Sequence, residues 1–200
     1  MRAITFDWGG VFTVGTFDGN ATQRMSDTYR APLEQVRASY FEHVKHLEVG
    51  EWTLDHFWNV MQAETGMKAD YLEFETLYLG SIRENAAMYD FFPTIPREFK
   101  VGLLSNNYPV VHEKLQTDPR WSRFDAMVFS NLIGVKKPDP VSFHKLSEAV
   151  GVPPEKSIFV DDVEENLVAA RALGFSTILY SALEHDRFLR ELEAWIAQGE

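Results

Sequence analysis

The feature that most constrains the fold is a set of five short apolar runs, rich in β-branched and aromatic residues. The runs cover residues 3–6, 101–104, 126–129, 157–160 and 177–180. From the second run onward they alternate with helical patterns, which predicts βαβ units and a parallel sheet. One helix has clear ends: Asp139 is a suitable N-cap, Pro140 suits the first helical position, and Gly151 suits the end.

A long helical block separates the first apolar run from the second. Between residues 17 and 89, apolar side chains recur at three- and four-residue spacing, as Val36, Tyr40 and Val44 do, and no strand pattern interrupts them. An insertion after the first strand of an open α/β sheet lies over the carboxyl ends of the strands, where ligands bind. We therefore expect an α/β core domain of residues 1–16 and 90–200, and a helical cap domain of residues 17–89.

The net charge of the chain limits the classes of partner that it can bind. The 200 residues carry a formal charge of −11, and the longest basic cluster is the pair Lys136-Lys137. Such a field repels nucleic acid and anionic lipid, so we expect neither nucleic acid nor membrane as a partner. No apolar stretch reaches the roughly 18 residues of a membrane-spanning helix. The absence of cysteine fits a reducing compartment, and the start of the chain has no apolar signal core, so we expect a cytoplasmic protein.

Polar residues follow the predicted strands directly or in the next loop. In chain order they are Asp7, Ser105, Asn106, Lys137, Asp161 and Asp162. Because the carboxyl ends of parallel strands share one edge of a sheet, we expect these side chains to converge on one pocket. Three carboxylates in one cleft repel one another unless a cation such as Mg²⁺ intervenes. Hydroxyl, amide and lysine donors suit a phosphate, so the set predicts a phosphoryl-transfer site.

Four segments carry these residues: FDWGGV, LLSNN, GVKKPDPVSFHKL and IFVDDVEENLVAARALGF. In order and spacing they resemble the four motifs of the haloacid dehalogenase-like (HAD) superfamily. They look most like the subgroup that includes α-glucose-1-phosphate phosphatases and the N-terminal phosphatase domain of soluble epoxide hydrolases, and the cap stretch GEWTLDHFW is similar to that subgroup too. The resemblance implies a three-layer, Rossmann-like parallel-sheet core with an all-helical cap inserted after strand 1. It also implies a Mg²⁺-dependent phosphatase that hydrolyses a small phosphorylated metabolite, such as a sugar phosphate, through an aspartyl-phosphate intermediate.

The resemblance also implies a role for each residue. Asp7 would be the nucleophile, and Lys137 would neutralise the charge of the phosphate. Ser105 and Asn106 would bind the phosphoryl oxygens together with Lys137. The implied Mg²⁺ ligands are Asp7, the backbone carbonyl of Gly9, Asp162, and Asp161 as a second or water-mediated ligand.

Gly9 departs from the superfamily pattern. Most phosphatases of the superfamily have a second aspartate there, which protonates the leaving group. Losing such a general acid costs ~10² to 10⁴ in rate. Either the substrate has a good leaving group, such as an anomeric sugar oxygen or an acyl phosphate, or a cap residue donates the proton. Asp18, in the segment of residues 14–20, is one candidate donor.

Three other functions stay open. The first is a metal-free 2-haloacid dehalogenase, although three acids around a carboxylate substrate without a cation are electrostatically unfavourable. The second is a phosphonoacetaldehyde hydrolase, whose DWAG start is similar to DWGG here, but Lys45 and Lys68 lack the cap motif that this chemistry needs. The third is a non-catalytic phosphometabolite-binding protein that lost the chemistry with the second aspartate.

Overall fold

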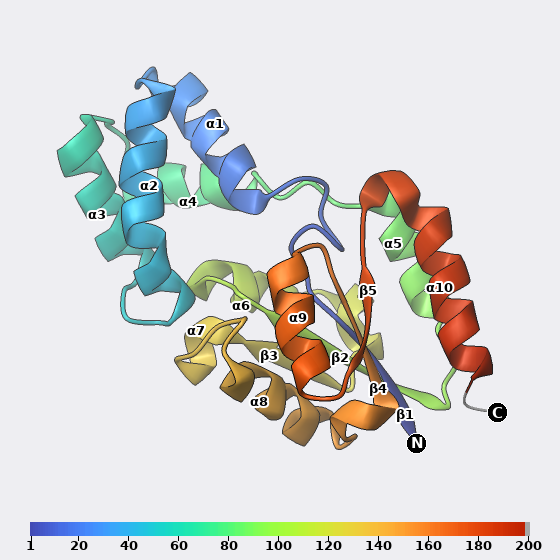
Figure 1. Cartoon of the computed structure of the whole chain (residues 1–200). Helices are drawn as coiled ribbons and strands as arrows, with labels where there is room; N and C mark the ends of the chain where they lie inside the picture. Colours follow the sequence, from blue (N-terminus) through green and yellow to red (C-terminus); the bar gives the residue numbers. More distant parts are fainter. Residues whose placement is uncertain (199–200) are drawn as a thin grey trace.

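The core of the molecule is a five-stranded, all-parallel sheet with the strand order β3-β2-β1-β4-β5 (Figure 1). The computed structural model describes residues 1–198. The strands are β1 (Arg2–Phe6), β2 (Phe99–Ser105), β3 (Ala126–Phe129), β4 (Ser157–Asp161) and β5 (Ser176–Leu179). All five predicted strands are present, with bounds within two residues of the expectation.

The register aligns the carboxyl ends of the central strands. Phe6, at the end of β1, pairs with Leu103 of β2 on one side and with Val160 of β4 on the other. The residues that follow these pairs therefore emerge at the same edge of the sheet. This register is what lets distant parts of the sequence form one site.

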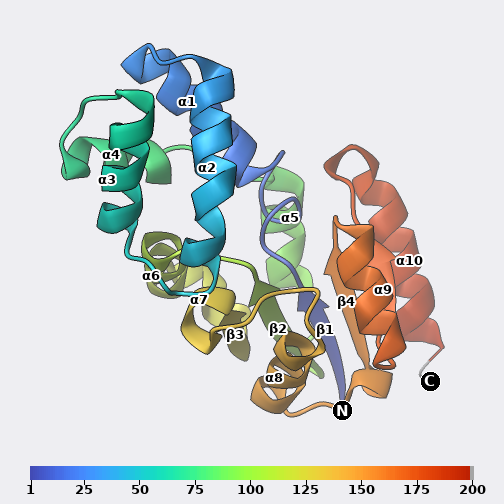
Figure 2. The same cartoon turned by 60° about the vertical axis from the view of Figure 1, so that its left-hand side comes forward.

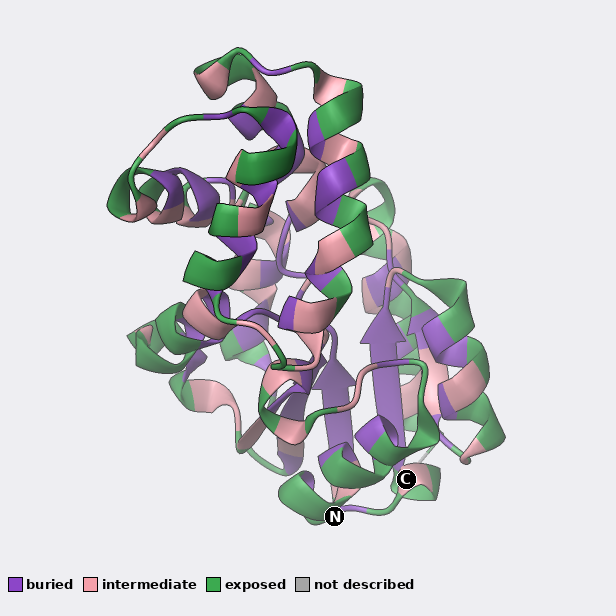
Figure 3. Ribbon diagram, turned by 90° about the vertical axis from the view of Figure 1, so that its left-hand side faces the viewer, coloured by how far each residue is buried: buried purple, intermediate pink, exposed green. Residues whose placement is uncertain are grey.

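Helices cover both faces of the sheet, which is why its strands are mostly apolar. On one face, α8 (Pro140–Val150) and α9 (Glu164–Ala172) bury Phe143 and Leu167 against the strands. On the other face lie α5 (Ala86–Phe91), α6 (Pro109–Thr117) and α10 (His185–Ala197). The central strands β1, β2 and β4 are buried along most of their length (Figure 3). The short elements are α7 (Ser130–Ile133) and 3-10 turns at Phe92–Thr94, Pro119–Arg123, Pro154–Lys156 and Ala182–Glu184.

The ends of α8 follow the sequence signals. The carboxylate of Asp139 accepts a hydrogen bond from the backbone N–H of Val141 at 2.8 Å, and Pro140 is the first helical residue. Gly151 ends the helix in the left-handed conformation, with φ of 74°. The predicted N-cap, first residue and stop are therefore all confirmed.

Four helices of the inserted segment pack into a bundle beyond the carboxyl edge of the sheet (Figures 2 and 3). They are α1 (Phe17–Tyr29), α2 (Leu33–Glu48), α3 (Leu54–Thr65) and α4 (Tyr71–Leu79). Trp58 and Phe74 stack in its interior with ring centroids 4.2 Å apart, and both are buried. The aromatic residues at helical spacing thus form the core of the bundle, as amphipathic helices require.

The last helix of the predicted cap, α5, packs elsewhere. Its Phe91 makes an edge-to-face contact with Phe188 of α10, at 5.2 Å between centroids. The ring of Tyr89 is tilted by 49° to that of Trp121 of the core, with 5.0 Å between the centroids. The four-helix bundle itself ends with α4 at Leu79, and the division of the chain at residue 89 stays a prediction.

Contacts at two ends of the bundle join it to the core. The ring of Phe17 in α1 lies 5.6 Å from that of Tyr108, which follows β2. At the other end, Glu48 of α2 forms a 2.5 Å ion pair with Lys136 in the loop after α7. The bundle is therefore held over the sheet edge from two sides. Within residues 1–198, no helix combines the length and apolar character needed to cross a lipid bilayer.

Candidate active site

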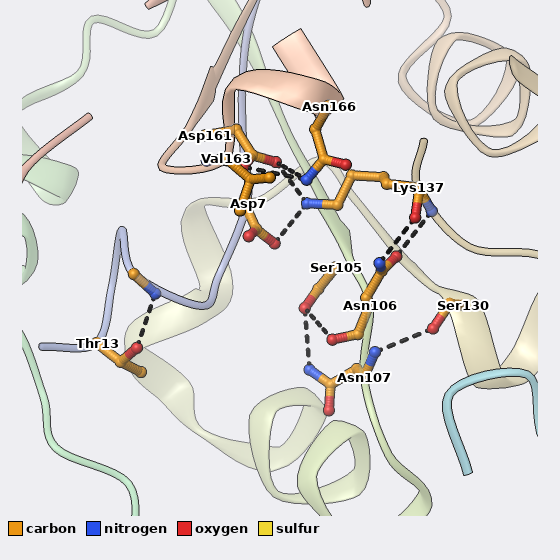
Figure 4. A network of polar contacts seen from close by, with 11 residues as sticks. Asp7, Thr13, Ser105, Asn106, Asn107, Ser130, Lys137, Asp161, Val163 and Asn166 are labelled. Atoms are coloured by element: carbon orange, nitrogen blue, oxygen red, sulfur yellow. Dashed lines mark hydrogen bonds and ion pairs between the residues drawn. The ribbon is translucent and has the colours of Figure 1, made fainter. Parts of the chain in front are cut away.

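Three carboxylates meet at the carboxyl edge of the sheet, and two of them, those of Asp7 and Asp161, are drawn in Figure 4. Asp7 follows β1, Asp161 is the last residue of β4, and Asp162 comes next. Each offers one oxygen atom, and these oxygens all lie within 4.8 Å of one another. The predicted convergence of acids from the two ends of the chain is present.

Lys137 neutralises part of this charge. Its Nζ lies 2.7 Å from Asp7 Oδ1 and 2.7 Å from Asp161 Oδ2, and its side chain is 1% exposed. A lysine so buried needs both partners, because an unpaired ammonium in the interior is costly. The ammonium thus bridges β1 and β4 from a loop that belongs to neither strand.

Asn106 holds the loop that carries Lys137. Its Oδ1 accepts a hydrogen bond from the backbone N–H of Lys137 at 2.8 Å, and its Nδ2 donates to the carbonyl of the same residue at 3.1 Å. This two-point clamp fixes the lysine backbone relative to the end of β2 (Figure 4). Ser105, the neighbouring residue, is fully buried, and its Oγ accepts from Asn107 Nδ2 at 3.2 Å.

Asp161 is fully buried, and its carboxylate has several hydrogen-bond and ion-pair partners. Besides Lys137, it accepts a hydrogen bond from the backbone N–H of Val163 at 2.8 Å and from Asn166 Nδ2 at 3.2 and 3.0 Å. These contacts orient a carboxylate that in turn orients the lysine. Asn166, in the first turn of α9, therefore acts on Asp161 directly.

Burial and the negative charge of neighbouring acids disfavour ionisation of Asp7 and Asp162. Burial raises the pKa of Asp7 to about 7, with Lys137 opposing the shift and Asp161 adding to it. Burial and the charge of Asp161 also raise the pKa of Asp162 to about 6. Burial alone lowers the pKa of Lys137, but the charges of Asp161 and Asp7 outweigh it and leave that pKa above its usual value. One ammonium does not balance three carboxylates, so the cluster favours an added cation.

The turn after Asp7 is shaped by two glycines with different constraints. Gly10 has φ of 69°, and a Cβ there would lie 2.0 Å from Asp162 Oδ2. This position therefore requires glycine, both for its conformation and for the close approach of Asp162. Gly9 has no such constraint: a Cβ would meet only Asp7 Oδ2, at 3.9 Å.

A cavity of about 170 Å³ opens on the cluster. The core contributes Asp7, Gly9, Gly10, Asn106, Lys137 and Asp162, and the bundle contributes Phe17, Asp18 and Glu48. Ser105 and Asp161 are not among the residues that line it, so in this conformation they support the site from behind. The cavity is smaller than the roughly 300–1,000 Å³ of drug-sized ligand pockets, which suits a small molecule.

The bundle side of the cavity carries a half-buried carboxylate, that of Asp18, whose hydrogen-bond partners the sequence did not indicate. Asp18 Oδ1 accepts hydrogen bonds from Tyr40 at 2.5 Å and from Tyr108 at 2.6 Å. Tyr40 also lies 3.0 Å from Tyr78, hydroxyl to hydroxyl. Burial raises the pKa of Asp18 above its usual value, and the two tyrosine hydroxyls oppose that shift.

Sequence reasoning missed Glu48 and Tyr108. Tyr108 stands three residues after β2, close enough to the strand end to have been included in the candidate set. Glu48 has no local signal, because it reaches the cavity only through the packing of α2 over the core. Burial raises the pKa of Glu48, while its ion pair with Lys136 opposes the shift.

The donor set of the cavity suits a hard divalent cation. Mg²⁺ takes oxygen ligands in octahedral geometry at about 2.0–2.1 Å, so its ligand oxygens lie within about 4 Å of one another. Asp7 and Asp162 line the cavity with such oxygens, which lie within 4.8 Å of each other, so a small movement of the side chains would bring them to a shared ion. Lys137 then remains as the donor for an anionic group bound beside the cation.

Comparison with known proteins bears on the whole chain. The haloacid dehalogenase-like hydrolase family matches residues 1–174. A phosphatase from Mycobacterium tuberculosis is 32% identical over 219 aligned positions, which cover 97% of this chain and 94% of that protein. A D-ribitol-5-phosphate phosphatase from Bacteroides thetaiotaomicron is 26% identical and covers 88% of this chain and 90% of its own length.

Solved structures share the fold. A HAD family enzyme from Bacteroides thetaiotaomicron, in complex with magnesium and inorganic phosphate, superposes with a TM-score of 0.77 at 19% identity, covering 91% of this chain and 95% of that one. An L-2-haloacid dehalogenase from Xanthobacter autotrophicus gives a TM-score of 0.66 at 19% identity, covering 96% and 82%. The family match over residues 1–174, the 32% identical relative and the α/β core with its cluster of strand-end acids agree: this chain belongs to the haloacid dehalogenase-like hydrolases.

Proposed function

We propose that this hydrolase is a Mg²⁺-dependent phosphatase of small phosphorylated metabolites. One observation carries the proposal: the carboxylates of Asp7 and Asp162 and the ammonium of Lys137 line one small cavity. Carboxylates, a cation site and a lysine together are suited to a phosphoryl group, which needs its charge neutralised while a nucleophile attacks in line. The phosphatases among its relatives add support.

Asp7 is the proposed nucleophile. It attacks phosphorus through a carboxylate oxygen, the ester oxygen leaves with the electron pair of the P–O bond, and an aspartyl phosphate forms on Asp7. Water then hydrolyses that acyl phosphate and regenerates the carboxylate. Mg²⁺ bound to Asp7, Asp162 and the carbonyl of Gly9 would supply Lewis-acid stabilisation of the phosphoryl oxygens.

The remaining predicted residues act on this geometry. Lys137 neutralises the phosphoryl charge, and Asn106 keeps it in place through its backbone clamp. Asp161 supports the same lysine from behind, at 2.7 Å. The hydroxyl of Ser105 donates to the carbonyl of Asn106 at 3.4 Å, so it would have to turn its hydrogen from that carbonyl to donate to a phosphoryl oxygen.

The turn after Asp7 has no general acid to protonate the leaving group of the substrate. With glycine at position 9, the turn after Asp7 offers no side chain to protonate an alkoxide. We therefore propose substrates whose leaving group departs easily, such as an anomeric sugar oxygen. Turnover of glucose-1-phosphate should exceed that of glucose-6-phosphate, and equal rates would remove the support for this substrate class.

The basic activity is tested with p-nitrophenyl phosphate, whose leaving group needs no protonation. We expect Mg²⁺-dependent hydrolysis that is lost in EDTA and in Asp7→Asn, and retained in Asp55→Asn, an exposed acid of α3. Chloride release from 2-chloropropionate in EDTA would instead identify a dehalogenase. Tight binding of phosphosugars without turnover would identify a non-catalytic protein.

A further inference from the structure

The side of the cavity that faces the nucleophile from the bundle is acidic. Asp18 in the first turn of α1 and Glu48 at the end of α2 both line it. Among the described residues that line the cavity, Lys137 is the one with a cationic side chain, and it is held between Asp7 and Asp161. Lys136, just outside, is paired with Glu48 at 2.5 Å.

The charges of the proposed site can be balanced group by group. A divalent cation and the ammonium of Lys137 supply three positive charges against the three carboxylates of Asp7, Asp161 and Asp162. A phosphate ester then adds its own negative charge at that end of the cavity. Asp18 and Glu48 face the rest of the substrate with one cation, Lys136, between them, so this end has no cation to spare for a second anionic group.

One carboxylate oxygen of Asp18 is held in place by the protein, and the other is available to accept a hydrogen bond. Its Oδ1 is taken by the hydroxyls of Tyr40 and Tyr108. Its Oδ2 has no hydrogen-bond partner among the described residues and belongs to a residue that lines the cavity. Two phenol donors on one oxygen hold the carboxylate in place and favour its charged form. Trp8 adds an unpaired donor at the same cavity: the residue is 2% exposed, and its Nε1 is buried without a partner.

We propose that Asp18 is a specificity-determining residue whose Oδ2 accepts a hydrogen bond from a hydroxyl group on the leaving group. The site then selects phosphate esters of small, uncharged, hydroxylated alcohols and rejects esters that carry a carboxylate. This inference rests on the proposed phosphatase function and adds the class of substrate. A carboxylate in the position of that hydroxyl faces Asp18 and Glu48 at close range, and its repulsion is not screened as it is in water.

Three esters of similar size test the proposal: 2-hydroxyethyl phosphate, 2-phosphoglycolate and ethyl phosphate. They place a hydroxyl, a carboxylate or no polar group at the same distance from phosphorus. For the unmodified protein we expect kcat/KM for 2-hydroxyethyl phosphate to exceed that for 2-phosphoglycolate by about tenfold or more, with ethyl phosphate between them. Asp18→Asn, which keeps the shape and removes the charge, should reduce the first ratio by about fivefold or more.

The controls separate recognition from other roles of Asp18. Asp27→Asn makes the same charge change on an exposed position of α1 and should leave the ratio unchanged. A ratio of two substrates does not depend on the fraction of protein that is folded. If Asp18→Asn slows both esters equally, Asp18 donates a proton or supports the fold, and the proposal is wrong. It is equally wrong if the unmodified protein hydrolyses 2-phosphoglycolate as well as 2-hydroxyethyl phosphate.

A separate assay tests the proposed phosphatase function itself. If p-nitrophenyl phosphate is not hydrolysed with Mg²⁺, the phosphatase proposal fails. The order of affinity for the three esters is still measured by calorimetry, with the Asp7→Asn protein in Mg²⁺. Tighter binding of 2-hydroxyethyl phosphate than of 2-phosphoglycolate, lost in Asp7→Asn/Asp18→Asn, would support the role of Asp18; equal binding would refute it.

Discussion

Replacing Gly9 with aspartate should increase the activity of this protein, which is an unusual direction for a substitution next to a nucleophile. The position has room: a Cβ at residue 9 has Asp7 Oδ2 at 3.9 Å as its nearest contact, and its backbone does not need glycine. The introduced carboxyl starts two residues after Asp7, where most phosphatases of the superfamily carry their general acid.

The expected gain depends on the leaving group. A positioned general acid contributes ~10² to 10⁴ in rate when the leaving group is a poor one. Two carboxylates about 4 Å apart repel by about 4 kcal/mol at an effective dielectric constant of about 20. That repulsion raises the pKa of the introduced carboxyl and so favours the protonated form that a general acid needs. We expect Gly9→Asp to raise kcat for glucose-6-phosphate by about tenfold or more, and to leave p-nitrophenyl phosphate within about threefold.

The assay is steady-state phosphate release with saturating Mg²⁺, and Gly9→Asn is the matched control. Asparagine has nearly the same shape but has no proton to donate at neutral pH. The reasoning is refuted if Gly9→Asn gains as much as Gly9→Asp, or if Gly9→Asp speeds both substrates by the same factor. A loss of activity with retained folding would show that the turn after Asp7 is less open than its geometry indicates.

Three further predictions follow from the charges and the backbone of the site. Lys137→Met should lower the free energy of unfolding by about 3–5 kcal/mol, because it leaves Asp7 and Asp161 buried without their cation. Urea unfolding measures this change. The control is Lys145→Met, which removes an exposed pair with Glu148 and should change the free energy of unfolding by less than about 1 kcal/mol. A change below about 1 kcal/mol for Lys137→Met would contradict the ion-pair account. In EDTA the melting temperature should fall as the pH rises from 5 to 8. The pKa of Asp7 is raised to about 7 and that of Asp162 to about 6, so the folded protein binds their protons more tightly than the unfolded chain does. The resulting contribution to the free energy of unfolding is complete below the ordinary pKa of a carboxyl group and is lost as the pH passes the raised values. Added Mg²⁺ should raise the melting temperature more at pH 8 than at pH 5, and calorimetry that gives the opposite order would count against a metal at these carboxylates. Gly10→Ala should weaken Mg²⁺ binding by about tenfold or more, because its Cβ would meet Asp162 Oδ2 at 2.0 Å. Gly66→Ala has nearly the same positive φ with nothing within 4 Å, so it should cost stability without changing Mg²⁺ affinity in a titration; equal effects of the two would refute the steric argument.

The core could be predicted because its signals are local. Each strand is a short apolar run. Helix α8 begins after Asp139, whose carboxylate caps it, and ends at Gly151, whose backbone takes the left-handed conformation. Parallel pairing then brings the strand ends together without any further information. The meeting of Asp7 with Asp162 is a consequence of topology, and topology could be read from the alternation of the two patterns.

The sequence could not predict in the same way which acid faces Lys137 and which one lines the cavity. Asp161 and Asp162 are neighbours in sequence, and successive side chains of an extended chain point in different directions. Pairing in β4 decides that Asp161 turns inward to Lys137 while Asp162 lines the cavity. Ser105 is the same case: as the last residue of β2 it is buried beside Asn107.

The bundle side of the site depends on packing between distant segments. Asp18 becomes a cavity residue because Tyr40 and Tyr108, 22 and 90 residues away, hold its carboxylate. Glu48 lines the cavity because its pair with Lys136 ties α2 to the core. No periodicity along the chain records such contacts, and the residues that set specificity are the ones for which sequence patterns say least.

The central claim is that Asp7 receives the phosphoryl group beside a divalent ion shared with Asp162. A crystal structure of the protein with Mg²⁺ and beryllium fluoride tests it directly. The account predicts beryllium fluoride bonded to an Asp7 carboxylate oxygen, with one Mg²⁺ bound to Asp7, Asp162 and the carbonyl of Gly9, and with Lys137 against a fluorine. A structure in which Asp7 carries no adduct, or in which Asp7 and Asp162 share no ion, would contradict it.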